Sequence, residues 1–111
     1  MYKIINEDFT LVKDYPAPEI YRTFSDSEKE NIKIFKTEID KLTTEKGLGK
    51  VSVNVSYDGP NIERAFALKY SNGYSYKHYY DEINKITMHM RDFSEKNNLY
   101  DFYLNSYIIL K

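Results

Sequence analysis

The chain has 111 residues, with 16 basic and 17 acidic side chains, a net charge of -1 and no cysteine. This length suits one domain, so we expect residues 1–111 to form a single domain. The lack of cysteine excludes disulfides, zinc–thiolate sites and thiol nucleophiles. Basic and acidic residues are balanced along the chain, so no segment supplies the basic field that binds duplex nucleic acid.

The sequence predicts a cytoplasmic protein without a membrane anchor. No apolar run approaches the roughly 18 residues of a membrane span. Glu7 and Asp8 are acidic residues that arrive too early for a signal peptide. The absence of disulfides also favours the cytoplasm.

The first half of the chain predicts a strand region followed by a helix. Residues 2–13 indicate an irregular strand or hairpin, and Tyr15–Glu19, with two prolines, indicates a loop. A helix is predicted for residues 26–46, because Ser25 and Glu28 fit a capping box and Gly47 fits a helix end. Its apolar stripe consists of Ile32, Phe35, Ile39 and Leu42.

The second half predicts three strands, a helix and a final strand. Residues 51–57 alternate between apolar and polar, residues 62–70 follow a turn, and Asn72-Gly73 is a hairpin signal that leads into a strand at 74–80. We expect these three strands to form an antiparallel meander. A helix over residues 80–97 and a buried strand over residues 100–110 complete the chain.

The predicted fold class is α+β, with the order β-α-β-β-β-α-β along the chain. Two helices are expected on one face of a mainly antiparallel sheet.

Candidate catalytic and metal-binding groups are few. His78 lies near Asp81 and Glu82 in the sequence, and these three could serve a small enzyme, whereas His89 belongs to another element. Neither histidine has the spacing of a known ligand motif, and no serine lies in a nucleophile motif. We therefore predict no catalytic residues, no metal site and no cofactor.

Tyrosine is the unusual feature of the composition, with 12 residues against six phenylalanines and no tryptophan. A low-GC genome, such as that of a bacterium or its phage, would explain part of this excess. The densest run contains Tyr74, Tyr76, Tyr79 and Tyr80. Our favoured interpretation is that these rings cover the sheet and pack against the helices. The alternative is an exposed row that docks a protein or stacks on bases.

These observations predict a small non-enzymatic binding protein of the inhibitor or immunity type, acting against a toxin or a nuclease-type effector in bacterial toxin immunity or phage anti-defence. Binding to single-stranded nucleic acid through the tyrosine-rich strand, with Lys69 and Lys77 on phosphates, is the first alternative. The enzyme built on His78 is the second. The predicted partner-binding residues are Tyr70, Asn72, Tyr74, Tyr76 and Lys77. Both a monomer and a homodimer fit the sequence.

Overall fold

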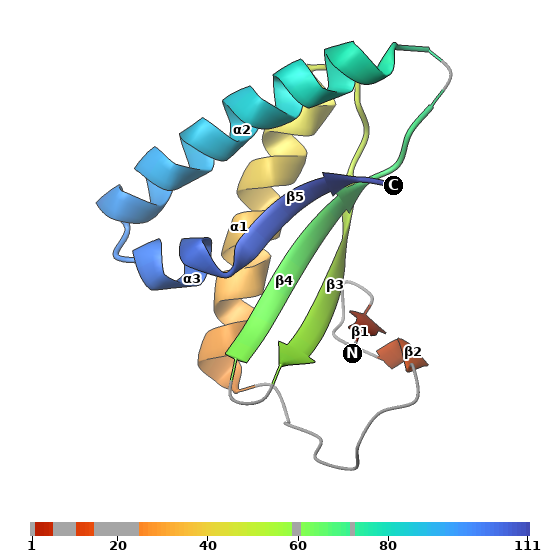
Figure 1. The fold of residues 1–111 in the computed structure, drawn as a ribbon. Coiled ribbons are helices and arrows are strands. Elements are labelled where there is room, and N and C mark those ends of the chain that lie inside the picture. The colour runs from red at the N-terminus through yellow and green to blue at the C-terminus, as the bar shows by residue number, and fades with distance from the viewer. Residues whose placement is uncertain (1, 6–10, 15–24, 59–60, 72) are drawn as a thin grey trace.

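The computed structural model describes residues 2–5, 11–14, 25–58, 61–71 and 73–111. It is an α+β fold in which helices pack on a mixed sheet (Figure 1). The elements in chain order are β1 (Tyr2–Ile5), β2 (Leu11–Asp14), α1 (Asp26–Glu45), β3 (Val51–Asp58), β4 (Asn61–Leu68), α2 (Tyr76–Lys96), α3 (Tyr100–Leu104) and β5 (Ser106–Leu110). The loop predicted at Tyr15–Glu19 lies outside the described residues.

The strands are ordered β2-β1-β3-β4-β5 across the sheet. β1 pairs antiparallel with β2 and β3, and β3 pairs antiparallel with β4. The β1–β2 register shifts between Ile4 and Ile5, which confirms the irregular hairpin predicted near the start of the chain. β5 pairs with β4 in parallel, because α2 and α3 form the crossover that a parallel connection requires.

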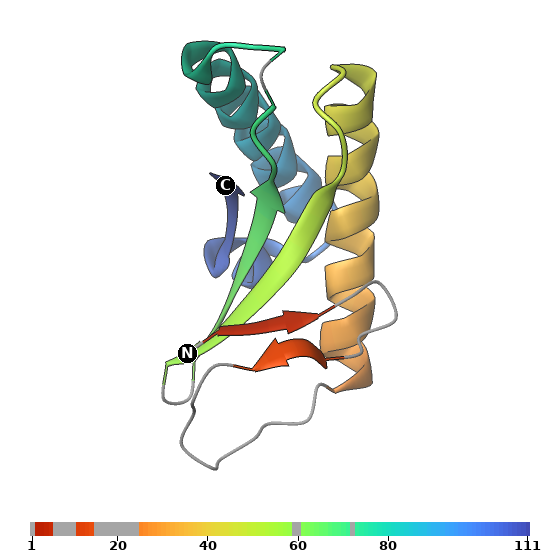
Figure 2. The same cartoon turned by 90° about the vertical axis from the view of Figure 1, so that its right-hand side faces the viewer.

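One face of the sheet meets the two long helices. Val53 pairs with Phe66 and Phe66 with Ile108, so these three side chains point to the same face. In Figure 2, α1 runs beside β3, and β4 crosses in front of α2. The core joins this face to the helix stripes through Ile32, Phe35, Ile39, Val51, Val53, Val55, Phe66, Leu68, Tyr79, Ile83, Ile86 and Met90.

Helix α1 follows the sequence prediction closely. The Ser25 hydroxyl accepts a hydrogen bond from the Glu28 N–H at 3.1 Å, as the capping box requires. Gly47 ends the helix with a positive φ of 72°. Asp40 accepts a hydrogen bond from the Val51 N–H at 2.8 Å, and this contact fixes the start of β3 against the helix.

The predicted strand at 74–80, and with it the third strand of the meander, is wrong. Ser75 is instead the N-cap of α2, and its hydroxyl accepts a hydrogen bond from the His78 N–H at 3.1 Å. Helix α2 therefore begins at Tyr76, four residues before the predicted helix over 80–97. Tyr79 lies on the helix stripe, four residues before Ile83, and burying it favours the helical period over the strand period.

The final apolar run is also divided differently from the prediction. Tyr100–Leu104 forms the short helix α3, and the strand begins at Ser106. Asn98, with a positive φ of 57°, turns the chain between α2 and α3, and Phe102 is buried. Within the described residues β5 pairs with β4 alone, so it is an edge strand and not a strand buried between neighbours.

Candidate functional site: a tyrosine cluster at the start of α2

Four of the five predicted partner-binding residues, Tyr70, Tyr74, Tyr76 and Lys77, lie where the chain leaves β4 and enters α2. We call Tyr70, Tyr74, Tyr76, His78 and Tyr79 the tyrosine cluster. Tyr70 comes shortly after β4, whereas the other four lie just before α2 or in its first turn. The cluster therefore surrounds the helix start and does not line a strand. Asn72 lies outside the described residues, and Gly73 lacks the positive φ of the expected hairpin turn.

Tyr79 anchors the cluster from below. Its side chain is fully buried, and its hydroxyl lies 3.0 Å from the Ser71 N–H and 2.8 Å from the Ser71 Oγ. These hydrogen bonds satisfy a buried polar group and hold the loop before α2 against the helix. In the sequence, the spacing of Tyr79 four residues before Ile83 indicates a core position, but no sequence pattern signals the hydrogen bonds of its hydroxyl to Ser71.

The outer rings of the cluster form two stacked pairs. Tyr70 and Tyr76 stack with ring centroids 4.3 Å apart and planes 11° apart. Tyr74 stacks on His78 at 4.6 Å and 19°. Tyr74 and Tyr76 are 38% and 57% exposed, so each pair presents aromatic surface to solvent while its partner ring restricts its motion.

The end of α1 supports the same region from the side. A Cβ placed on Gly47 would lie 3.0 Å from the Tyr74 hydroxyl oxygen. Lys46, beside this glycine, forms an ion pair with Glu82 of α2. The end of α1 and the start of α2 are therefore joined by one close packing contact and one charged contact.

Two cations near the cluster, Lys46 and Lys77, are paired with carboxylates, whereas Lys69, next to Tyr70, is exposed and has no ion pair among the described residues. Lys77 donates a hydrogen bond to Asp81 at 2.8 Å, which lowers the pKa of Asp81 and raises the pKa of Lys77. The hydrogen bond from Lys46 lowers the pKa of Glu82, and the positive charge of Lys85 contributes in the same direction. A negative carboxylate thus accompanies both Lys46 and Lys77, so the local field is mixed in sign.

Each group of the proposed enzyme has another partner in the structure. The imidazole of His78 stacks on Tyr74, whereas Asp81 bonds to Lys77 and Glu82 to Lys46. Among the residues that the structure describes, no group of three or more His, Asp or Glu side chains is placed to hold a metal ion.

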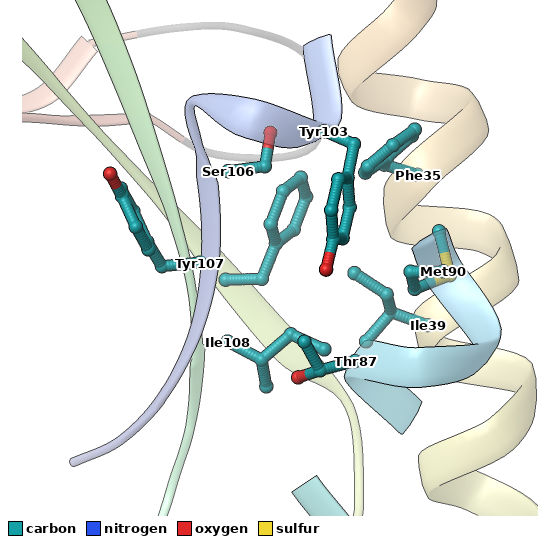
Figure 3. Close-up of a pocket in the computed structure, with 9 residues that line it drawn as sticks. Phe35, Ile39, Thr87, Met90, Tyr103, Ser106, Tyr107 and Ile108 are labelled. Atoms are coloured by element: carbon teal, nitrogen blue, oxygen red, sulfur yellow. The ribbon is translucent and has the colours of Figure 1, made fainter. Parts of the chain in front are cut away.

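A small cavity lies between α1, α2 and β5 (Figure 3). It has a volume of about 20 Å³, which is room for roughly one water molecule. Pockets for small-molecule ligands have volumes of about 300–1,000 Å³, so this cavity is a packing gap and not a ligand site. Its lining residues are Phe35, Ile39, Phe66, Thr87, Met90, Tyr103, Ser106, Tyr107 and Ile108.

Comparison of the chain with protein-family models, with curated proteins and with solved structures finds no match. Among the described helices, none has the length and apolar character needed to cross a membrane.

Proposed function

We propose that this is a small non-enzymatic binding protein of the inhibitor or immunity type, which docks a protein partner through the tyrosine cluster. The observation that carries the proposal is the pair of exposed aromatic stacks fixed above buried Tyr79. A toxin or a nuclease-type effector is the partner class that we propose, with blockade of its surface as the mechanism.

The stacked rings are suited to binding because little freedom remains for them to lose. Side chains that become ordered on docking cost free energy, and a ring already stacked on a neighbour avoids part of that cost. Tyrosine also combines a large apolar area with a hydroxyl that can bond at the rim of an interface. A rigid patch at a helix start therefore suits a protein that blocks its partner without a conformational change.

The paired charges favour a protein partner over single-stranded nucleic acid. Stacking platforms for nucleic acid work together with cations that follow the phosphates. Lys77 is the cation closest in sequence to Tyr76, and its ammonium is bonded to Asp81. Binding of phosphates at Lys77 would have to displace a carboxylate, which leaves Lys69 as the one predicted phosphate contact without such a competitor, whereas a protein interface can accommodate a mixed rim.

The test compares capture by the wild type and by Tyr74→Ala/Tyr76→Ala. The wild type, tagged and incubated in host lysate, should retain a specific protein that the double variant loses. Once that protein is purified, the double variant should bind it more weakly by roughly 2–4 kcal/mol, the range of interface hot spots. Tyr100→Ala is the matched control, because Tyr100 is 41% exposed and lies on α3, outside the cluster.

Thermal melting of all three proteins shows whether the fold survives. Equal melting with unchanged affinity in Tyr74→Ala/Tyr76→Ala would place the interface elsewhere and contradict the proposal. Titration with a labelled single-stranded oligonucleotide distinguishes the alternative. Binding that weakens steeply with salt and is lost in the same double variant would favour nucleic acid.

A further inference from the structure

The free edge of β5 is the feature of the fold that the tyrosine cluster does not explain. In the described part of the chain, β5 lies at the end of the sheet and pairs with β4 alone. Edge strands expose unpaired backbone groups, and proteins protect them with charges, prolines or bulges. β5 has the sequence Ser-Tyr-Ile-Ile-Leu and carries none of these protections.

The direction of the unpaired groups follows from the hydrogen bonds to β4. The Arg64 N–H donates to the Asn105 carbonyl, and the Lys111 N–H donates to the Leu68 carbonyl. Alternate residues of a strand direct their N–H and C=O groups to opposite sides, so the odd-numbered residues here bond to β4. The backbone groups of Ile108 and Leu110, and of Ser106 where the strand begins, therefore point to the free edge.

We propose that the protein forms a symmetric dimer in which β5 pairs antiparallel with β5 of a second copy, with Ile108 on the two-fold axis. Ile108 then lies opposite Ile108 of the other copy, and Ser106 lies opposite Leu110. These positions are the ones whose backbone groups are free, so each pair exchanges two hydrogen bonds as in an antiparallel ladder. The sheet would continue through both copies.

The side chains of β5 are self-complementary in this register. Tyr107 and Ile109 are 48% and 39% exposed on the sheet face opposite the helices. In the dimer, Tyr107 of each copy would lie opposite Ile109 of the other copy. Aromatic and β-branched residues form favourable cross-strand pairs. Lys111 would lie opposite Asn105 and not opposite its own copy, so the two-fold creates no clash of like charges at the ends of the strand.

Helix α2 extends the contact beside the strand. Thr87 lies next to Ile108 at the cavity between α2 and β5, whereas the Tyr107 ring lies on the other side of the strand (Figure 3). Three exposed residues lie on the same flank of α2 as Thr87, because Asn84, Arg91 and Tyr80 are three, four and seven residues away from it. Arg91 is the charged residue among these three, and Tyr80 is 54% exposed.

The size of this surface sets the expected strength. A five-residue strand pair alone falls short of the roughly 800 Å² per partner of a standard interface, and the flank of α2 is needed to approach it. We therefore expect a reversible dimer with a dissociation constant in roughly the micromolar range. Its melting temperature should rise with protein concentration.

The test uses sedimentation equilibrium of the full chain and a charge-swap series. Tyr107→Glu places a charge opposite Ile109 of the other copy, and Ile109→Lys places one opposite Tyr107. Because the dimer is symmetric, each change occurs twice. Each should weaken association by roughly tenfold. The double variant Tyr107→Glu/Ile109→Lys places Glu opposite Lys twice and should recover association. An equimolar mixture of the two single variants should form a heterodimer for the same reason.

Two controls separate the dimer from folding and from the proposed function. Ser52→Lys adds the same charge to the same sheet face, two strands away from β5, and should dimerise like the wild type. Tyr74→Ala should also dimerise normally, because the described contacts of Tyr74 are with His78, Tyr79 and the end of α1 and not with β5. Circular dichroism of each variant establishes that it is folded.

Several outcomes would overturn the proposal. A wild type that stays monomeric up to several hundred micromolar would contradict the dimer. This holds even if β5 accepted a strand from another protein. A dimer that Ile109→Lys leaves unchanged would place the contact elsewhere. Failure of the double variant to recover, while it remains folded, would exclude the antiparallel register centred on Ile108.

Discussion

Arg64 of β4 and Glu28 of α1 form a partly buried, two-point ion pair between the sheet and the first turn of the helix. The Nε atom of Arg64 donates to Glu28 Oε2 at 3.1 Å, and Nη2 contacts Oε1. The same guanidinium lies 3.9 Å above the ring of Phe102 in α3, and Arg64 is 5% exposed. One side chain of the sheet thus contacts both α1 and α3.

Arg64→Met should lower the free energy of unfolding by roughly 2–4 kcal/mol, because it leaves the Glu28 carboxylate partly buried without its cation. The double variant Arg64→Met/Glu28→Met should be more stable than this single variant, since no uncompensated charge remains. Urea denaturation measures both. Strictly additive losses would show that the two residues act independently.

The sequence predicted α1 and the β3–β4 hairpin because local signals and tertiary packing agree there. The Ser25 cap, the stripe through Phe35 and the alternation from Val51 each pointed to the element that forms. Arg64 shares the sheet face of Phe66, and a charged residue on an apolar face was a signal for a buried partner. The identity of that partner depends on how α1 crosses the sheet, which no local pattern contains.

The start of α2 was mispredicted because two local signals disagreed. Alternating tyrosines after Asn72-Gly73 favour a strand, whereas Ser75 as a cap and Tyr79 as a stripe residue favour a helix. Burial of Tyr79 decides the outcome, and it depends on tertiary packing. Three members of the tyrosine cluster, Tyr70, Tyr74 and Tyr76, are therefore among the predicted partner-binding residues, but the stacking of Tyr74 on His78 and the arrangement around a helix start were not predicted.

Tyr79→Phe tests the anchor beneath the cluster. The change keeps the buried ring and removes the hydroxyl that contacts Ser71, which leaves the Ser71 N–H without this partner. We expect a loss of roughly 1–2 kcal/mol in the free energy of unfolding, measured in urea. Tyr80→Phe is the control, because Tyr80 is 54% exposed and should tolerate the change. Equal stability of the two variants would contradict an anchoring role for the Tyr79 hydroxyl.

Glu82 should contribute to the loss of stability in acid. Its pKa is lowered from the ordinary value of 4.5 by the hydrogen bond from Lys46. The unfolded chain therefore takes up a proton at a higher pH than the folded chain. The stabilisation is fully present above pH 4.5 and is lost as the pH falls through the lower pKa of the folded state.

Glu82→Gln should accordingly be less stable than the wild type at neutral pH, and the difference should shrink as the pH falls below 4.5. Thermal melting across the acid range measures this difference. Glu95→Gln, at an exposed position of the same helix, should follow the wild type at each pH. A stability gap for Glu82→Gln that stays constant down to the acid limit would show that the ion pair with Lys46 does not stabilise the fold.

Gly47 and Gly49 provide a matched pair for testing the contact between the end of α1 and the tyrosine cluster. Both have a positive φ, 72° and 87° respectively, so alanine at either position should cost roughly 1–2 kcal/mol of backbone strain. A Cβ at Gly49 would have no atom within 4 Å, whereas a Cβ at Gly47 would meet the Tyr74 hydroxyl at 3.0 Å. Gly47→Ala should therefore destabilise the protein more than Gly49→Ala in urea unfolding. Repeating both changes in a Tyr74→Phe background, which removes the hydroxyl, should bring the two losses together; a difference that persists there would mean that Tyr74 does not pack against the end of α1.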